Sequence, residues 1–260
     1  MTPYHTWIAF YTMLRKDMVR IFRIWVQTFV PPIITSALYF VVFGTVLGNR
    51  IGSMGGISYI AFVVPGLVMQ AVIQAAYANT SFTFFQSKFF VRNIDELLVS
   101  PVPPWVIIAG YVAGGVVRGI LVGSLVLVVS LLFTGLTVSI HSLGIILFFG
   151  LLSAIVFALA GLVNGIYAKT IDGVNIVPTF VLTPLTYLGG VFYSIHVLPT
   201  SWQPFVYANP IFYLINGFRY GFLGVSDISL TLCIAVLISI IIVLIGICWY
   251  LIRTGLGLKQ

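Results

Sequence analysis

The fold is decided by one stretch, Ile228–Ile252, which reads ISLTLCIAVLISIIIVLIGICWYLI and contains no charged residue. A helix rises about 1.5 Å per residue, so about 20 apolar residues cross the hydrocarbon core of a bilayer. The stretch therefore predicts a membrane-spanning helix. Cys233 and Cys248 lie fifteen positions apart within it. That spacing separates them by about 22 Å along a helix, so we expect no disulfide between them.

The whole chain shares this apolar character. Its 260 residues are 60% hydrophobic and only 7% charged, with a mean hydropathy of +1.16. Soluble domains carry roughly 25% charged residues, so the composition predicts an all-α integral membrane protein. The net charge of +7 suggests no nucleic-acid partner, because the basic residues flank apolar stretches and form no face of their own. Membrane lipids are the expected surroundings.

Further stretches are long enough to cross a membrane. Prolines interrupt the first and fifth, at Pro31–Pro32 and at Pro178 and Pro184, and neighbouring groups must then satisfy the freed carbonyls. No internal repeat is visible, so we expect a single domain over residues 1–260. The predicted spans cover residues of about 24–47, 57–82, 104–133, 142–167, 176–194 and 229–252.

The distribution of Lys and Arg predicts the orientation. With six spans and the amino terminus inside, the outer segments carry Arg50 and Arg219. The inner segments carry Arg15, Lys16, Arg20, Arg23, Lys88, Arg92, Lys169, Arg253 and Lys259. This excess of nine over two follows the positive-inside rule, so we expect both termini on the cytoplasmic side of a bacterial inner membrane.

Residues 1–23 predict an amphipathic helix in the membrane interface. Its apolar residues recur at helical spacing, and its basic residues lie mostly elsewhere on the helical wheel. The alternative is a frayed start of the first span. The apolar residues are Trp7, Tyr11, Leu14, Met18 and Phe22.

Residues of about 195–224 are apolar but broken by Pro199, Pro204 and Pro210 and by several glycines. We interpret this segment as short re-entrant helices in the outer leaflet, because a crossing helix needs an unbroken run. A seventh span is the alternative, although it would place the basic carboxy terminus outside.

The segment FVRNIDELLVSPVP, 90–103, places two of the chain's five acids side by side between apolar stretches. Phe90, Ile94, Leu97 and Leu98 share one helical face, which leaves the remaining surface to the polar residues. Ser100-Pro101 then ends the helix. Anionic lipid disfavours acids, so either solvent or a docked cytoplasmic protein faces them. The polar residues at issue are Arg92, Asn93, Asp95 and Glu96.

Motifs for catalysis are missing from the sequence. No Lys follows a Gly, so the chain has no Walker loop for ATP. The three histidines lie in separate segments without a paired acid or cysteine, which predicts no metal or catalytic centre. None of the five acids lies in a predicted span, which argues against a proton relay. We therefore expect no enzymatic activity in this chain.

Arg118 is the one charge near the middle of a predicted span. An arginine there must face protein or water. Either a tie between helices, which we favour, or contact with a transported substrate would explain it. Glycines with small-xxx-small spacing surround it and recur at Gly161 and Gly165; they favour tight packing within the bundle over a dimer seam.

Together, these features resemble the ABC-2 type permease family over nearly the whole chain. The resemblance rests on the order of elements, on RNIDELLVSPVP at 92–103 and on NPIFYLINGFRYGFLG at 209–224. VPGL at 64–67 and TFVLTPLTYLGGVFYS at 179–194 are most similar to the YadH-like branch, which resembles the permeases of nodulation-factor and daunorubicin exporters.

The resemblance implies a permease subunit of an ATP-binding cassette exporter that moves a lipid, glycolipid, drug or polysaccharide. Two copies would pair with two separate ATPase subunits, which bind the ATP and Mg; this chain would hold no cofactor. Residues of about 88–100 would be the coupling helix, with Arg92, Asn93, Asp95 and Glu96 facing the ATPase. The pathway would run between two copies of spans one, two and five, and the residues that line it would include Tyr39, Phe40, Tyr77, Asn79, Thr183 and Tyr187.

Two other functions fit the composition. The chain would be a self-contained channel or secondary transporter if it transports without a partner. It would be a structural or assembly protein if its loss disturbs the membrane without affecting transport.

Overall fold

A computed structural model describes residues 2–54, 56–133 and 140–258 of the chain. It is 82% helical with almost no strand, which confirms the all-α fold class. Within the described ranges, six helical segments are long and apolar enough to cross a membrane, as the sequence predicts. They are Trp25–Phe43, Tyr59–Phe89, Pro104–Phe133, Leu143–Tyr167, Ile171–Leu188 and Leu230–Thr254.

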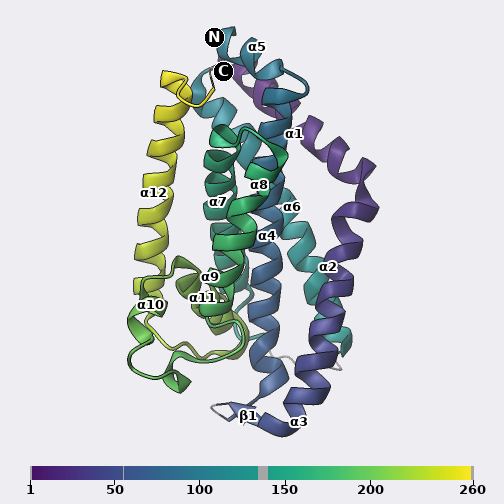
Figure 1. Cartoon of the computed structure of the whole chain (residues 1–260), viewed down its shortest axis with the longest axis vertical. Coiled ribbons are helices and arrows are strands. Elements are labelled where there is room, and N and C mark those ends of the chain that lie inside the picture. The colour runs from purple at the N-terminus through teal and green to yellow at the C-terminus, as the bar shows by residue number, and fades with distance from the viewer. Residues whose placement is uncertain (1, 55, 134–139, 259–260) are drawn as a thin grey trace.

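Helix α4 (Tyr59–Phe89) forms the centre of the bundle and packs along α6 (Pro104–Phe133) and α7 (Leu143–Tyr167). Figure 1 shows α12 (Leu230–Thr254) on one side of this core and α2 (Trp25–Tyr39) on the other. Both termini lie at the same end of the molecule (Figure 1).

The two ends of the bundle carry different small elements. The short helix α5 (Asn93–Val99) lies at the end that holds the termini (Figure 1). The opposite end holds α3 (Gly48–Ile51) and a two-stranded antiparallel hairpin of β1 (Ser53–Met54) and β2 (Ile57–Ser58). The hydrophobic pattern of the sequence did not predict this hairpin.

Glycines allow α4, α6 and α7 to approach one another closely. A Cβ atom at Gly165 of α7 would lie 2.7 Å from the Ser81 carbonyl oxygen of α4, and one at Gly161 would collide with the Tyr77 carbonyl oxygen. On α6, a Cβ at Gly119 would lie 3.0 Å from Ala76. The favoured prediction, that these glycines pack the bundle internally, is confirmed.

The first span is preceded by α1 (Pro3–Arg23), which ends where the backbone turns at Ile24. Helix α2 continues through Pro31 and Pro32 and becomes a wide π-helical segment, η1 (Phe40–Leu47). The hydroxyl of Ser36 donates to the Pro32 carbonyl at 2.7 Å. A side chain of the same helix thus bonds one backbone oxygen in the proline region.

The second and fifth spans differ from their predicted bounds. Helix α4 extends to Phe89 instead of ending near residue 82. The fifth span begins at Ile171, because the Thr170 side chain accepts a hydrogen bond from the Gly173 amide at 3.0 Å and caps the helix earlier than predicted. It consists of α8 (Ile171–Val177), η2 (Pro178–Leu182) and α9 (Thr183–Leu188).

Residues 195–223 form three short helices, η3 (Ile195–Val197), α10 (Gln203–Tyr207) and α11 (Pro210–Leu223). Helix α11 has 14 residues, too few for a crossing, and is buried along most of its length. Arg219 of α11 is 1% exposed and lies 3.8 Å above the Phe62 ring. It is therefore an internal tie between α11 and α4 and not the exposed charge of an outer segment that the sequence predicted.

Candidate functional site

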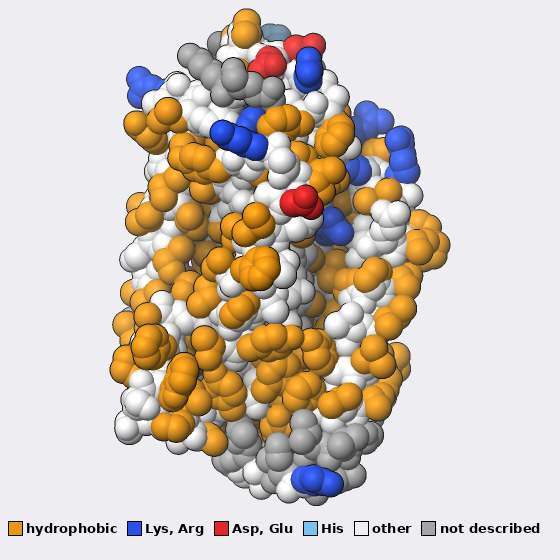
Figure 2. Space-filling model, viewed as in Figure 1, with side chains coloured by type: hydrophobic (Ala, Val, Ile, Leu, Met, Phe, Trp, Pro, Cys, Tyr) orange, Lys and Arg blue, Asp and Glu red, His pale blue; other side chains and the backbone are white. Residues whose placement is uncertain are grey.

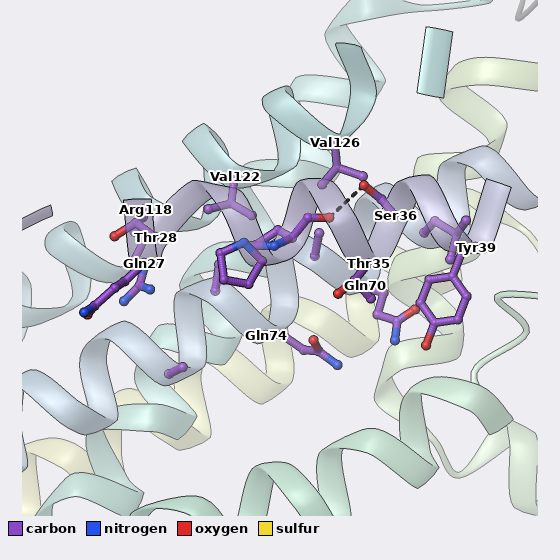
Figure 3. A pocket seen from close by; sticks show the side chains of 16 residues that line it. Gln27, Thr28, Thr35, Ser36, Tyr39, Gln70, Gln74, Arg118, Val122 and Val126 are labelled. Atoms are coloured by element: carbon purple, nitrogen blue, oxygen red, sulfur yellow. Dashed lines mark hydrogen bonds between the residues drawn. The ribbon is translucent and has the colours of Figure 1, made fainter. Parts of the chain in front are cut away.

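A groove of about 300 Å³ with many polar side chains lies within the spans, between α2, α4 and α6. Figure 3 shows Gln27, Thr28 and Arg118 gathered at one end of it, with Gln70 and Tyr39 at the other. A polar hollow in an apolar bundle is a candidate site for substrate, so we call it the membrane groove. The residues that line it are Gln27, Thr28, Pro31, Pro32, Thr35, Ser36, Tyr39, Leu67, Gln70, Ala71, Gln74, Ala75, Ala78, Arg118, Val122 and Val126.

Helix α2 contains two backbone carbonyls that lack their usual helical donors. Proline has no N–H group, so Pro31 and Pro32 leave the carbonyls of Gln27 and Thr28 without their usual helical donors. All four residues line the groove. The sequence predicted that the proline pair would free carbonyls, and the structure places the residues that carry them on the wall of the groove.

Helix α4 lines the groove with two amide side chains and three alanines. Gln70 and Gln74 lie one turn apart, and Ala71, Ala75 and Ala78 leave room between α4 and α2. Gln70 is buried, and its Oε1 has no hydrogen-bond partner among the residues that the structure describes. The groove therefore holds a buried acceptor that a ligand could satisfy.

Arg118 closes the groove through a network of polar side chains. Its Nη1 lies 3.5 Å from Asn79 Oδ1, which also accepts from Arg20 Nη2 at 2.7 Å. Asn79 Nδ2 lies 3.5 Å from Asp17 Oδ2, and Arg20 lies 3.9 Å from the Asp17 carboxylate. Helices α1, α4 and α6 are joined by this arginine network, defined as Asp17, Arg20, Asn79 and Arg118.

Asp17 is the acidic residue of the arginine network, and the sequence did not identify it as a partner of Arg118. It is 3% exposed, and α6 makes room for it with Gly114, where a Cβ atom would collide with its carboxylate. A signal did exist: Asp17 is the single acid among the first 94 residues, set within a basic helix. Helical spacing alone did not reveal that this side chain points into the bundle.

Burial shifts the pKa values of Asp17 and Arg20, which lie in α1 before the first span. It raises the pKa of the Asp17 carboxyl above 3.8, while Arg20, Lys16, Asn79 and Arg118 oppose the shift. Burial also lowers the pKa of Arg20, against the attraction of Asp17. The charged state of each is thus supported by its partners against desolvation.

The predicted pathway residues lie in different surroundings. Tyr39 lines the groove, and its hydroxyl lies 3.0 Å from that of Tyr187 on α9. Thr183 of α9 donates to the Pro178 carbonyl of η2 at 2.9 Å and so bonds within the fifth span. Phe40, Tyr77 and Asn79 are buried against neighbouring helices. The third wall of the groove is α6, whereas the predicted pathway used the fifth span.

Helix α5 presents its acids outward. Asp95 and Glu96 are exposed, while Ile94 is buried against the bundle with Leu97 and Leu98 packed beside it. Arg92 precedes the helix in a left-handed conformation, with φ of 54°. Figure 2 shows acidic and basic side chains together at this end of the molecule.

Two parts of the α5 prediction are wrong, and one lies outside the described structure. Phe90 is exposed, because α4 ends at Phe89 and the turn at Arg92 breaks the helical register with Ile94. The helix begins at Asn93 and not near residue 88. The side chain of Asn93 lies outside the described residues.

Lys88 is a buried anchor of α4. Its Nζ donates to the Ile166 carbonyl at 3.0 Å and also to the Gly257 carbonyl. These bonds join α4, the end of α7 and the segment after α12. Lys88 was predicted as part of the coupling helix and as a loop charge, but its bonds place it in the interior.

A further cavity connects α5 to the arginine network. It has a volume of about 380 Å³, and its lining includes Glu96 and Leu97 of α5 together with Lys16 and Asp17 of α1. The α5 residues Glu96 and Leu97 therefore face the same space as Asp17 of the arginine network.

Comparisons with known proteins agree with this architecture. The ABC-2 type transporter family matches residues 8–223. The inner membrane transport permease YadH of Escherichia coli (strain K12) is 54% identical over 254 residues, which cover 98% of each chain. Nodulation protein J of Rhizobium leguminosarum bv. viciae is 26% identical over 208 residues, 79% of each chain. The chain thus belongs to the ABC-2 type transporter family and is a membrane transport permease component.

Proposed function

We propose that the chain is the transmembrane subunit of an ATP-driven exporter, in which two copies associate with two ATP-binding subunits. The family implies an ATP-binding partner subunit. The observation that carries the rest is the arrangement of α5, whose apolar side is anchored in the bundle while Asp95 and Glu96 face outward at one end of the molecule. Such a helix suits docking to a soluble protein.

In this proposal α5 is the coupling helix and the end that carries it is cytoplasmic. Arg92, Asn93, Asp95 and Glu96 contact the ATPase, which holds the ATP and Mg. Closure of the ATPase dimer moves α5 relative to Lys16 and Asp17 of α1, which line one cavity with Glu96 and Leu97 of α5. Binding of ATP changes the membrane conformation only if the ATPase dimer has different affinities for the two conformations.

The membrane groove is the part of the pathway that each copy contributes. It is lined by α2, α4 and α6 and offers amides, hydroxyls and a guanidinium halfway through the bundle. Facing a second copy, two such grooves form a polar route shielded from lipid. Tyr39 and Tyr187 stand at one end of that route, joined through their hydroxyls.

Affinity purification of the chain from its native membranes in mild detergent tests the proposal. An ATPase should accompany the wild-type chain, and ATP hydrolysis should be measurable in the eluate. Transport by the purified chain alone in liposomes would instead support a self-contained channel or secondary transporter.

A further inference from the structure

We propose that the membrane groove binds the anionic head group of an amphiphile, and that Arg118 is the residue that recognises its negative charge. This inference rests on the proposed export function and adds to it the chemical class of the substrate. It follows from the charges of the arginine network, the lining of the groove and the basic cavity beside it.

The arginine network carries more positive than negative charge. Asp17 supplies one carboxylate, while Arg20 and Arg118 supply two guanidinium groups. Asp17 lies beside Arg20, and the oxygen of Asn79 is already bonded by Arg20 at 2.7 Å. Arg118 reaches that same oxygen only at 3.5 Å. The positive charge of Arg118 is therefore weakly matched by the residues around it.

Arg118 also has unused hydrogen-bonding capacity. Its buried Nε has no hydrogen-bond partner in the part of the chain that the structure describes. A guanidinium carries five N–H donors in a planar fork that fits the two oxygens of a carboxylate or phosphate. Since a buried cation without a partner is costly, an anion from the substrate would stabilise this side chain.

The rest of the groove suits a polar head group. Gln27 lies beside Arg118 (Figure 3), and Gln70 and Gln74 add amides farther along. The volume of about 300 Å³ is at the lower end for small-molecule sites, enough for a head group and too small for a whole lipid.

An apolar tail has a place outside the groove. Leu67, Val122 and Val126 form apolar parts of its wall. On α2, Ile34 and Leu38 are exposed by 54% and 61% on the outer surface of the helix bundle. A soluble anion would make no use of the apolar wall residues Leu67, Val122 and Val126, so the lining favours an amphiphile.

A basic cavity lies on the other side of the arginine network. It has a volume of about 480 Å³ between α1 and the end of α4, and Arg20 and Asp17 belong to its wall. Figure 2 shows basic side chains in the recess between the α1–α2 segment and the rest of the bundle. An anionic head group would be attracted there before it reaches Arg118. The basic residues that line this cavity are Arg15, Lys16, Arg20 and Arg23.

The test measures binding to the full chain in nanodiscs of phosphatidylcholine. Fluorescent short-chain phosphatidylglycerol is the anionic probe, phosphatidylcholine with the same label is the zwitterionic probe, and glycerol 3-phosphate is the soluble competitor. Arg118→Gln removes the charge and keeps an amide. Gln27→Glu, at an exposed position beside Arg118, neutralises the site without removing the arginine. Arg253→Gln removes an exposed positive charge elsewhere and is the control.

We expect the wild-type chain to prefer phosphatidylglycerol, and both groove variants to weaken its binding by about tenfold or more, as loss of a charge-assisted hydrogen bond predicts. Binding of phosphatidylcholine and the Arg253→Gln variant should not change. Unchanged phosphatidylglycerol binding in Gln27→Glu and in folded Arg118→Gln would overturn the assignment. Competition by glycerol 3-phosphate at equal concentration would show that the site binds a soluble anion. This result would overturn the proposal that the ligand is an amphiphile. Because no ATPase takes part, the result is independent of the proposed subunit assembly.

Discussion

At the residue scale, the chemistry of this protein depends on which polar side chains face inward. Arg118 could be identified from the sequence as a charge within a span. Its neighbours could not, because Asp17, Asn79 and Arg118 lie far apart along the chain and meet only after α1, α4 and α6 pack. Freed carbonyls were expected from the proline pair, but the pair does not indicate that Gln27 and Thr28, which carry them, line the groove.

The raised pKa of Asp17 predicts a dependence of stability on pH. The folded protein binds the proton of this carboxyl more tightly than the unfolded chain, because burial raises its pKa. The contribution of Asp17 to stability should therefore increase as the pH falls through the raised pKa toward 3.8, and decrease as the pH rises. As the pH is lowered toward 3.8, melting temperatures in detergent should rise more for the wild type than for Asp17→Asn. Parallel curves would contradict this assignment.

The close approach of α7 to α4 predicts a strong effect of a single methyl group. Gly161→Ala should destabilise the bundle by about 1–3 kcal/mol, because the new Cβ collides with the Tyr77 carbonyl oxygen. Gly246→Ala on α12 is the matched control, since nothing lies within 4 Å of its added Cβ. Thermal unfolding in detergent would compare the two, and equal melting temperatures would refute the packing argument.

At the scale of single elements, α5 shows how far a helical pattern can be trusted. The sequence predicted that Ile94, Leu97 and Leu98 face the bundle, and they do, because the heptad-like spacing holds within one unbroken helix. Phe90 failed the same prediction because the left-handed residue Arg92 separates it from that helix. A positive φ at a residue with a side chain has no signature in the hydrophobic pattern.

The left-handed conformation of Arg92 allows the effect of its backbone to be tested separately from the effect of its charge. Arg92→Gly should preserve or slightly raise stability, since glycine adopts a φ of 54° without the cost of about 1 kcal/mol that a side chain brings. Arg92→Gln should keep the cost and lose only the charge. If the ATPase contacts this charge, both variants should weaken its binding equally in a pull-down. Weakening by Arg92→Gly alone would assign the effect to the backbone.

At the scale of the whole molecule, the number of spans was predictable and their arrangement was not. A bilayer requires about 20 apolar residues per crossing, so the six spans could be counted from the sequence. Uniformly apolar helices give no indication of which face meets protein and which meets lipid. For that reason Tyr77 and Phe40 were assigned to a pathway, whereas they are buried within the chain.

Pairing of two copies across the groove predicts a specific cross-link. A cysteine at Gln74, which is exposed in the groove, should be joined to its counterpart by a short thiol cross-linker in membranes. Leu147→Cys, exposed on α7, is the control and should remain monomeric on denaturing gels. The native cysteines are both buried, so the wild-type chain should give no product. Equal cross-linking at both positions would contradict the pairing of two copies across the groove.

The central claim, that this permease works as the partner of a separate ATPase seated on α5, is tested most directly by affinity purification followed by an ATP hydrolysis assay. Wild type, the double variant Asp95→Lys with Glu96→Lys, and the control Thr200→Lys at the opposite end of the bundle would be purified side by side from native membranes. We predict an ATPase and its activity with the wild type and the control, and neither with the folded double variant. Equal recovery of the ATPase with all three proteins would contradict the role of α5, and its absence from all three, under conditions that preserve other complexes, would contradict the subunit assembly itself.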